Sequence, residues 1–264
     1  MLHSALLNVM IKAARRAGRG LKRDLGEVEN LQVSLKGPAN FVTIADKRAE
    51  DAVYSELAKA RPGYGFIGEE GGTREGTDSS HVWIVDPLDG TTNFLHGMPH
   101  FAVSIALKRE DAIVAGVIYN PANDDLFVAE KGKGAFLNDQ RLRVAGRKKL
   151  SEAVIACGLP HLGRGDFETA SREMAALQPH VAGLRRFGAA SLDLAWVAAG
   201  RFDGYWERNL AAWDMAAGIV LVREAGGFVS DFEGRDAIFE TGNIIAGNEY
   251  IQREIVTALK PIGN

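Results

Sequence analysis

Apolar residues recur at helical and strand spacing along the first half of the chain. Positions four apart, such as Leu2, Leu6 and Met10, predict a first helix, and a second helix is predicted from about Asp46 to the Pro62-Gly63 dipeptide that ends it. The sequence also predicts strands over residues 31–35 and 40–44 around a turn at 37–40, further strands over 65–68, 81–85, 101–108, 112–119, 126–130 and 134–144, and a Gly/Thr/Ser-rich loop over 71–80. We therefore expect an α+β half with an antiparallel sheet.

The pattern changes near residue 145, where Gly146-Arg147-Lys148-Lys149 forms a polar junction. Beyond it, strands expected over 154–157, 183–187, 202–206, 227–231 and 244–246 alternate with helices expected over 167–178, 189–199, 212–225 and 248–260. Such alternation is typical of an α/β fold. We therefore expect two halves, residues 1–145 and 146–264, that together form a layered α/β protein.

Composition excludes several classes of protein. The chain has 264 residues, enough for one large domain or two closely packed ones. Its 31 basic and 34 acidic side chains give a net charge of −3, which disfavours a nucleic-acid-binding module. The longest apolar stretches, 112–119 and 216–222, are far shorter than the roughly 20 residues of a transmembrane helix. A single cysteine, Cys157, cannot form an intrachain disulfide, which favours a reducing, cytoplasmic location.

The most informative segment follows the strand expected over 81–85 and reads Asp86-Pro87-Leu88-Asp89-Gly90-Thr91-Thr92-Asn93. Proline and glycine turn the chain there, and the Thr-Thr-Asn sequence is able to begin a helix. Backbone N–H groups at Gly90 and Thr91 can receive a phosphate, while Asp86 and Asp89 offer the oxygen ligands that a divalent cation prefers. An ordinary turn would explain the same segment taken alone.

Other acids favour the metal-site interpretation. Residues 75–107 hold four acids and no lysine or arginine, so a cation is a natural neutraliser for Asp86 and Asp89. Glu69 follows another short strand, and Asp214 lies in the first turn of an expected helix, where the helix dipole alone would explain it. Each feature is weak in isolation, and their joint occurrence predicts a site shared by metal and phosphate.

These motifs resemble those of the inositol monophosphatase family, the Mg²⁺-dependent, lithium-sensitive sugar phosphatases. The resemblance runs from Lys36 and Val42-Thr43-Ile44-Ala45-Asp46 through Gly68-Glu69-Glu70 and D-P-x-D-G-T-T-N-F to Trp213-Asp214. The segment 185–193 is most similar to bacterial members, although Ala212 stands where many of them have proline. The family implies the layered αβαβα sandwich of the sugar phosphatases and a homodimer.

The resemblance also implies roles for individual residues. The acids matching Glu69, Asp86, Asp89 and Asp214, with the carbonyl oxygen of Leu88, would hold two or three Mg²⁺ ions over the substrate phosphate. Thr91, supported by Asp46, and Glu69 would orient a metal-activated water and take its proton, so that the water attacks inositol monophosphate directly and in line. The substrate contacts implied are Asp89, Gly90, Thr91, Arg185, Ala190, Glu207 and Asp214.

Glu207 is the residue expected to recognise the sugar. It follows the strand expected over 202–206 and precedes Asp214 by seven residues, so we expect it at the rim of the metal site. There it would accept hydrogen bonds from sugar hydroxyls, as the matching glutamate does in the family. Ala190 would leave room for the ring, and Arg185 would approach from the side or from a partner subunit. A solvated glutamate paired with Arg208 is the simpler alternative.

Other functions stay open. Fructose 1,6-bisphosphate, histidinol phosphate and 3′-phosphoadenosine nucleotides are alternative substrates, served by related sites. A metal-binding regulatory or scaffold protein on the same fold is an alternative of another class. A haloacid-dehalogenase-type phosphatase is disfavoured, because its two aspartates stand two residues apart, whereas Asp86 and Asp89 are three apart.

Overall fold

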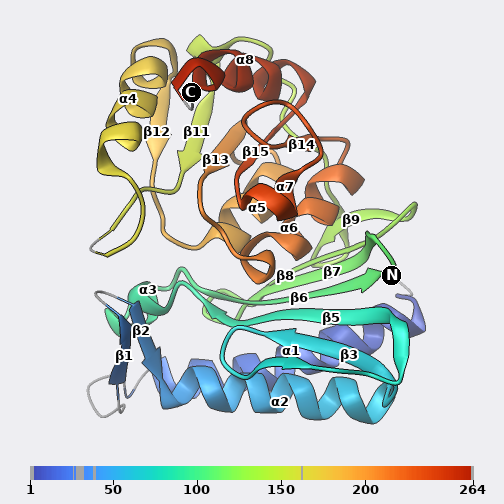
Figure 1. Ribbon diagram of the computed structural model, residues 1–264. Helices are drawn as coiled ribbons and strands as arrows, with labels where there is room; N and C mark the ends of the chain where they lie inside the picture. Colours follow the sequence, from blue (N-terminus) through green and yellow to red (C-terminus); the bar gives the residue numbers. More distant parts are fainter. Residues whose placement is uncertain (1–2, 26, 28–32, 38–39, 162, 263–264) are drawn as a thin grey trace.

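Helices and sheets alternate in five layers in the computed structural model (Figure 1). It describes residues 3–25, 27, 33–37, 40–161 and 163–262, and the layers are those of this described part of the chain. From the bottom of Figure 1 upward, a helical layer, the large sheet, a central helical layer, the smaller sheet and an outer helical layer follow one another. The expected αβαβα arrangement is confirmed.

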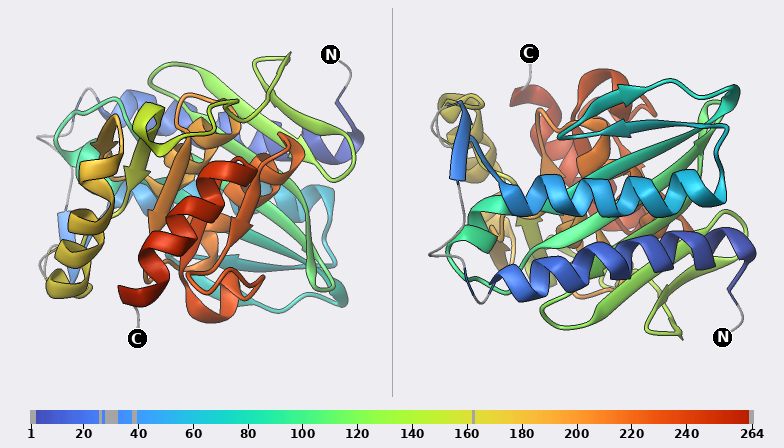
Figure 2. Two further views of the ribbon diagram at one scale, coloured as in Figure 1. Left: turned by 90° about the horizontal axis from the view of Figure 1, so that it is seen from above. Right: turned by 90° about the horizontal axis from the view of Figure 1, so that it is seen from below.

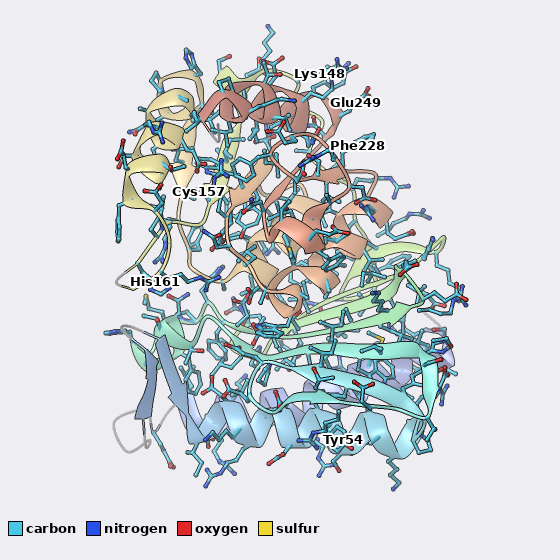
Figure 3. The ribbon with its side chains drawn as sticks, in the orientation of Figure 1. Tyr54, Lys148, Cys157, His161, Phe228 and Glu249 are labelled. Carbon is cyan, nitrogen blue, oxygen red and sulfur yellow. The ribbon has the colours of Figure 1, made fainter. Side chains whose placement is uncertain are left out.

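The first layer consists of two long helices, α1 (Ala5–Leu25) and α2 (Ile44–Ala60), which lie side by side on the large sheet (Figure 2). In α1 one face, including Met10, is buried and the other carries basic side chains, as expected for a helix that covers a sheet. In α2 the apolar residues spaced four apart are buried, as predicted: Ala49, Val53 and Leu57. Tyr54 of α2 packs edge-on against Phe66 in the sheet, with ring centroids 5.1 Å apart (Figure 3).

The large sheet carries two of the acids predicted for the site, Asp86 and Asp89. Among the described residues it has eight strands, in the spatial order β10 (Gln140–Arg141), β9 (Gly134–Leu137), β8 (Asp125–Glu130), β7 (Ala112–Asn120), β6 (Ala102–Arg109), β5 (Asp78–Asp89), β3 (Tyr64–Gly68) and β4 (Gly72–Arg74). All neighbours are antiparallel except β3 and β5, which run parallel. The predicted antiparallel sheet is therefore confirmed for most of its pairs.

Two predictions for this sheet are wrong. The expected loop over 71–80 contains β4 and the start of β5, because β4 is held by pairing with β3 rather than by a hydrophobic pattern of its own. The expected strand over 134–144 breaks after Leu137. Asn138 and Asp139 have φ angles of 45° and 68°, so they turn the chain into the short hairpin between β9 and β10.

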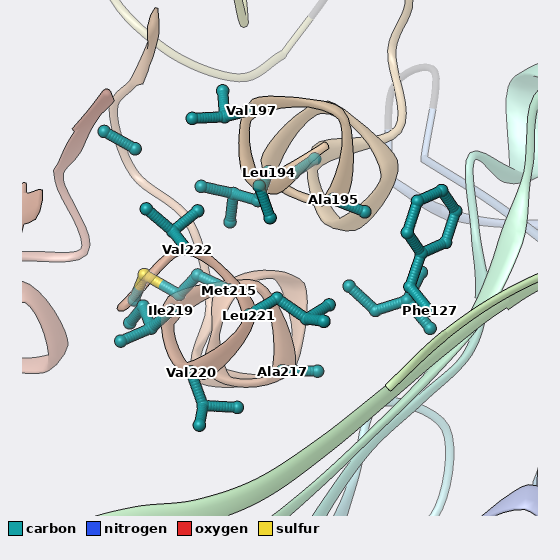
Figure 4. Close-up of a cluster of buried hydrophobic side chains, with 14 of the residues drawn as sticks. Phe127, Leu194, Ala195, Val197, Met215, Ala217, Ile219, Val220, Leu221 and Val222 are labelled. Carbon is teal, nitrogen blue, oxygen red and sulfur yellow. The ribbon is translucent and has the colours of Figure 1, made fainter. Parts of the chain in front are cut away.

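The central layer consists of α5 (Ala190–Ala198) and α6 (Ala212–Glu224), which pack against each other between the sheets (Figure 4). Every residue of α6 from Met215 to Val222 is buried, as expected for a helix that is apolar on all sides. Leu194 of α5 and Phe127 of β8 belong to the same buried cluster. This cluster joins the central helices to the large sheet.

The smaller sheet and the outer helices come from the second half of the chain. In spatial order its strands are β12 (Gly183–Arg185), β11 (Val154–Cys157), β13 (Gly204–Glu207), β15 (Ile244–Gly247) and β14 (Phe228–Ser230). The strands β12, β11 and β13 run parallel, whereas β15 is antiparallel to β13 and β14. Helices α4 (Phe167–Leu177) and α8 (Glu249–Leu259) cover the outer face (Figure 2, left).

The predicted alternation of strands and helices in this half is confirmed. Two short helices complete the fold: α3 (Thr91–Leu95), which the Thr-Thr-Asn sequence predicted, and α7 (Ile238–Thr241), which the pattern did not predict. None of the described helices is long and apolar enough to cross a membrane.

A few predictions lie outside the described residues: Leu2 of the first helix, Leu31 and Gln32 of the strand over 31–35, and Pro38 and Ala39 of the turn at 37–40. Next to them, β1 (Val33–Gly37) and β2 (Asn40–Thr43) pair antiparallel. The division of the chain at residue 145 stays a prediction. The large sheet ends at Arg141 and the smaller one begins at Val154, yet one buried cluster contains residues from both halves.

Candidate active site

A cavity of about 510 Å³ lies where the helices α3, α5 and α6 begin. Nine of the predicted site residues line it: Glu69, Asp86, Leu88, Asp89, Gly90, Thr91, Ala190, Glu207 and Asp214. The rest of the wall includes residues 158–161 and 163–166, and His161 is labelled in Figure 3 near the level where the two halves of the molecule meet. Residues predicted from distant segments are thus brought together in one cavity.

The Asp86-Pro87-Leu88-Asp89 segment forms the irregular end of β5. The register with β6 shifts between Asp86 and Asp89, so the strand bulges at a proline that could not donate a ladder hydrogen bond. Asp86 Oδ1 accepts a hydrogen bond from the Leu88 N–H at 2.9 Å, which holds the bulge. As a result both aspartates line the same cavity although they are three residues apart.

Gly90 turns the chain from β5 into α3. Its φ of 88° lies in the left-handed region, which an L side chain rarely adopts. Thr91 then begins the helix, and its hydroxyl donates toward two oxygens, Asp46 Oδ1 at 3.2 Å and the Leu88 carbonyl at 3.1 Å. Asp46 is fully buried in the first turn of α2 and does not line the cavity, so it acts on the site through Thr91.

Two helix N-termini hold the remaining aspartates. Asp89 Oδ2 accepts hydrogen bonds from both the backbone N–H, at 2.8 Å, and the hydroxyl of Ser191 in the first turn of α5. Asp214 Oδ2 accepts the N–H of Ala211 at 2.7 Å, at the start of α6. A helix N-terminus stabilises a carboxylate, so each site aspartate also caps the helix beside it. Ala212, in place of the proline of many bacterial relatives, still leaves Asp214 on the cavity wall.

Glu69 directly follows β3. Its backbone N–H donates to the carbonyl of Val85, 3.2 Å away, and Val85 immediately precedes Asp86. The parallel pairing of β3 with β5 therefore brings Glu69 to the same edge of the sheet as the two aspartates.

The acids of the cavity crowd one another electrostatically. Burial raises the pKa of Asp86 well above its ordinary value, and repulsion from Glu69 and Asp89 adds to the effect. Burial also raises the pKa of Asp214 to about 7, with repulsion from Asp89 contributing. The pKa of Asp89 is raised to about 7, again by burial, although hydrogen bonds from Ser191 lower it. A positive charge bound among these carboxylates would therefore stabilise their ionised forms.

The donor set fits a divalent cation such as Mg²⁺. Among the described residues that line the cavity, seven carry carboxylates and three carry guanidinium groups, and oxygen donors are those that Mg²⁺ prefers. Within the described part of the chain no three His, Cys, Asp or Glu side chains are already gathered into a metal site. Repulsion between the carboxylates opposes such a cluster until a cation neutralises them.

Glu207 lies on the cavity wall at the end of β13. Its Oε2 accepts a hydrogen bond from the hydroxyl of the buried Tyr205, and burial raises its pKa to about 7. A Cβ on Gly158 would collide with the Glu207 side chain, so the loop after β11 packs directly on it. The alternative pairing with Arg208 is wrong, because Arg208 Nε donates to Glu173 at 2.5 Å instead.

The expected place of Arg185 in the cavity of its own chain is not found. Arg185 ends β12, is exposed, and donates to the Leu184 carbonyl at 2.8 Å, whereas Arg186 lines the cavity. Successive residues of an extended chain point to opposite sides, so only one of the two arginines can face the cavity. An approach of Arg185 to the site of a partner subunit stays a prediction.

Several further charged residues line the wall that were not predicted from the sequence. Arg164 reaches the cavity from an irregular segment, and its Nη2 lies 4.0 Å from Asp214 Oδ2. The half-buried Arg208 and the buried Glu173 form an ion pair that also lines the cavity. No hydrophobic period marks residues 158–166, so the pattern could not place Arg164. The alternation of strand residues indicates that only one of Arg185 and Arg186 can face the cavity, but the sequence alone does not show which one.

The chain is similar to known proteins over almost its whole length. The model of the inositol monophosphatase family matches residues 3–263. The chain is 62% identical over 260 residues to an inositol-1-monophosphatase of Mesorhizobium japonicum, with 98% of both chains covered. It is 44% identical over 260 residues to a Nus factor SuhB of Pseudomonas aeruginosa, covering 97% of this chain and 96% of that protein.

A solved structure has the same fold over almost the whole chain. The crystal structure of the extragenic suppressor protein suhB from Bartonella henselae has a TM-score of 0.95 to this chain at 60% identity, covering 97% of this chain and 99% of that one. Since the family model and these relatives extend over almost the entire chain, the protein belongs to the inositol monophosphatase family.

Proposed function

We propose that the protein is a cytoplasmic, Mg²⁺-dependent phosphatase that hydrolyses inositol monophosphate to inositol and phosphate. One observation carries the proposal: four carboxylates from distant segments, Glu69, Asp86, Asp89 and Asp214, line one cavity beside the Thr91 hydroxyl. Family membership and the name of the Mesorhizobium relative support the choice of substrate.

These four carboxylates and the carbonyl oxygen of Leu88 would hold two or three Mg²⁺ ions. When bound, the ions supply Lewis-acid chemistry, since they neutralise phosphate charge and make water more acidic. The backbone N–H groups of Gly90 and Thr91 would bind phosphate oxygens at the start of α3. The negative cavity would then hold an anionic substrate only with its cations present.

The chain's own residues would prepare the nucleophile. Asp46 and the Leu88 carbonyl hold the Thr91 hydroxyl as a donor, so its lone pairs are left to accept a hydrogen bond from water. Glu69 would take the proton of that water. The water oxygen would form a bond to phosphorus as the bond from phosphorus to the inositol oxygen breaks, and the inositol oxygen would take a proton from a solvent water, which balances the proton that Glu69 accepts.

Glu207 and Ala190 would recognise the sugar. Glu207 presents a carboxylate to accept hydrogen bonds from hydroxyl groups, while the small Ala190 leaves space for the ring. A phosphate-release screen tests this proposal, with inositol monophosphate, fructose 1,6-bisphosphate, histidinol phosphate and 3′-phosphoadenosine 5′-phosphate, each with Mg²⁺ and with EDTA. We expect the highest kcat/KM for inositol monophosphate, no activity in EDTA, and inhibition by millimolar Li⁺. Preference for another of these substrates would reject the proposed one.

A second candidate role follows from the names of other relatives. Relatives 42–44% identical to this chain are called Nus factor SuhB. We propose, as the alternative, that the chain is a regulatory or scaffold protein that binds metal on the same fold. Mg²⁺ binding without release of phosphate from any substrate of the screen would favour this alternative.

We also propose that the chain forms a homodimer. Phe187 is 36% exposed and packs against His100 in a tilted arrangement and against Trp196 edge-on, with ring centroids 5.0 and 5.6 Å away. Met98, two residues before His100, is 43% exposed. Exposed aromatic and methionine side chains are enriched in protein interfaces. Light scattering should give twice the mass of the chain, and the variant Phe187→Glu should give the monomer mass. A monomeric wild-type protein would reject this proposal.

A further inference from the structure

Glu50 is a buried carboxylate that does not line the cavity. It is only 2% exposed and lies on α2, four residues after Asp46. Burial of a carboxylate is costly unless its oxygens accept hydrogen bonds. Glu50 Oε2 accepts one from the backbone N–H of Glu70, 2.9 Å away. The contact joins α2 to the turn that carries Glu69.

The turn between β3 and β4 is shaped around this carboxylate. A Cβ on Gly68 would collide with Glu50 Oε2, and a Cβ on Gly71 would lie 2.5 Å from Glu50 Oε1. Glycine at both positions therefore lets the Glu50 carboxylate sit between the two ends of the turn. The two residues between these glycines are Glu69 and Glu70.

Both amide groups next to the Cα of Glu69 are anchored. The N–H of Glu69 donates to the Val85 carbonyl at 3.2 Å, and the N–H of Glu70 donates to Glu50. Fixing the peptide on each side of a residue fixes the direction in which its side chain leaves the backbone. The Glu69 carboxylate is thereby held on the cavity wall.

Asp46 and Glu50 are four residues apart on α2, so they lie on one face of that helix. Asp46 contacts Thr91 and Glu50 contacts the turn of Glu69, the two residues to which the proposed function assigns the attacking water. We propose that Glu50 is a positioning residue that holds Glu69 in place for Mg²⁺ binding and for catalysis. This inference rests on the proposed function, in which Glu69 is a metal ligand.

The test replaces Glu50 in the full-length protein and measures Mg²⁺ binding by calorimetry, in addition to kinetics. Glu50→Met keeps the length of the side chain but removes the acceptor for the Glu70 N–H. We expect it to weaken Mg²⁺ binding and to lower kcat, each by about 10-fold or more, as is typical for groups that orient a metal ligand. KM for inositol monophosphate should change little. Glu50→Gln retains an acceptor oxygen and should restore both quantities to near wild-type values.

Glu56 provides a matched control on the same helix. Its carboxylate pairs with Lys12 at 2.7 Å and Arg16 at 2.5 Å, away from the cavity lining. Glu56→Met should lower the melting temperature, because it removes contacts between α2 and α1, but leave Mg²⁺ binding unchanged. If Glu50→Met does not fold, Gly71→Ala is a second probe. Gly71 lies in an exposed turn, and the added Cβ would push the Glu50 carboxylate out of its place. It should also weaken Mg²⁺ binding.

Each of the following results would overturn the inference. Wild-type Mg²⁺ affinity in folded Glu50→Met or in Gly71→Ala would mean that the contact does not position Glu69. Equal losses of affinity in Glu50→Met and Glu56→Met would mean that both act only through stability. A wild-type protein that neither binds Mg²⁺ nor releases phosphate would reject the proposed function, and this inference with it. Wild-type activity combined with an unaffected Glu50→Met variant would reject the Glu50 inference alone.

Discussion

The hydroxyl of Thr91 lies 3.2 Å from the carboxylate of Asp46, although 45 residues separate them in the chain. The contact links the start of α3 to the start of α2, two helix termini that meet at the edge of the large sheet. Asp46 is buried and does not line the cavity, and its carboxylate contacts the site through the Thr91 hydroxyl. The donor direction of that hydroxyl is therefore set by two oxygens: the Asp46 carboxylate, which lies outside the cavity lining, and the Leu88 carbonyl, 3.1 Å away.

Removing the Thr91 hydroxyl tests its role in the proposed mechanism. Thr91→Ala should lower kcat by about 100-fold or more, because the water would lose its orienting acceptor. Mg²⁺ affinity should change little, since no carboxylate is lost. Thr91→Ser keeps a hydroxyl and should recover most of the activity. Steady-state kinetics and a calorimetric Mg²⁺ titration would check this, and an unchanged kcat in Thr91→Ala would refute the role.

Asp86→Asn should weaken Mg²⁺ binding and stabilise the metal-free protein. The buried Asp86 carboxylate is repelled by Glu69 and Asp89, and its raised pKa means that ionising it opposes folding above the ordinary pKa of an aspartate. Asparagine removes the charge but keeps Oδ1 as an acceptor for the Leu88 N–H. We expect a higher melting temperature in EDTA together with at least about 10-fold weaker Mg²⁺ binding.

The exposed Asp111 provides a control for the two effects predicted for Asp86→Asn, on the melting temperature and on Mg²⁺ binding. Asp111→Asn should change neither the melting temperature in EDTA nor the Mg²⁺ affinity. If Asp86→Asn lowered the melting temperature in EDTA, or bound Mg²⁺ as tightly as the wild-type protein, Asp86 would not be a repelled metal ligand.

Glu207→Ala should reduce the use of sugar substrates more than the use of simple ones. A buried acceptor that loses its hydroxyl partner costs about 1–3 kcal/mol, so kcat/KM for inositol monophosphate should fall by about 10- to 100-fold. An aryl phosphate has no such hydroxyls and should be hydrolysed almost as before. Tyr205→Phe, which removes the hydrogen bond to Glu207, should cause a smaller loss of the same kind. Equal losses on both substrates would instead assign Glu207 to the metal site or to the fold.

The parts of the site that are continuous in sequence could be predicted from it. The turn after β5 and the start of α3 follow from Pro87, Gly90 and the residues after it, because proline and glycine restrict local backbone geometry whatever surrounds them. Asp214 could likewise be placed in the first turn of a helix. These features depend on neighbours within about five residues.

The parts that depend on long-range pairing could not be predicted. In the sequence Glu50 is one residue of a predicted helix, with nothing to mark it as functional. Only the folded structure brings the Gly68–Gly72 turn into contact with it. β4 forms because it pairs with β3, not because its own residues favour a strand. Similarly, whether Arg185 or Arg186 faces the cavity depends on how β12 pairs with β11, which a single strand does not reveal.

His100 should make the protein sensitive to acid. Burial lowers the pKa of its imidazole to about 4, and its Nε2 has no hydrogen-bond partner among the described residues. In the unfolded chain an imidazole ionises near pH 6.5, so between about pH 6.5 and 4 the unfolded state binds the additional proton. The stability that His100 contributes is therefore present above pH 6.5 and is lost as the pH falls toward 4, by about 2 kcal/mol at pH 5.

Urea unfolding of wild-type protein and His100→Phe at pH 8 and pH 5, both in EDTA, measures this loss. Phenylalanine fits the ring contacts with Phe187 and Trp196, and the backbone carbonyl of His100 still accepts from Asn93 at 2.7 Å. The variant should match the wild-type protein at pH 8 and be the more stable of the two at pH 5. His96→Phe, at an exposed position, should follow the wild-type protein at both pH values. If His100→Phe lost as much stability as the wild-type protein between pH 8 and 5, the acid sensitivity would have to arise from another group.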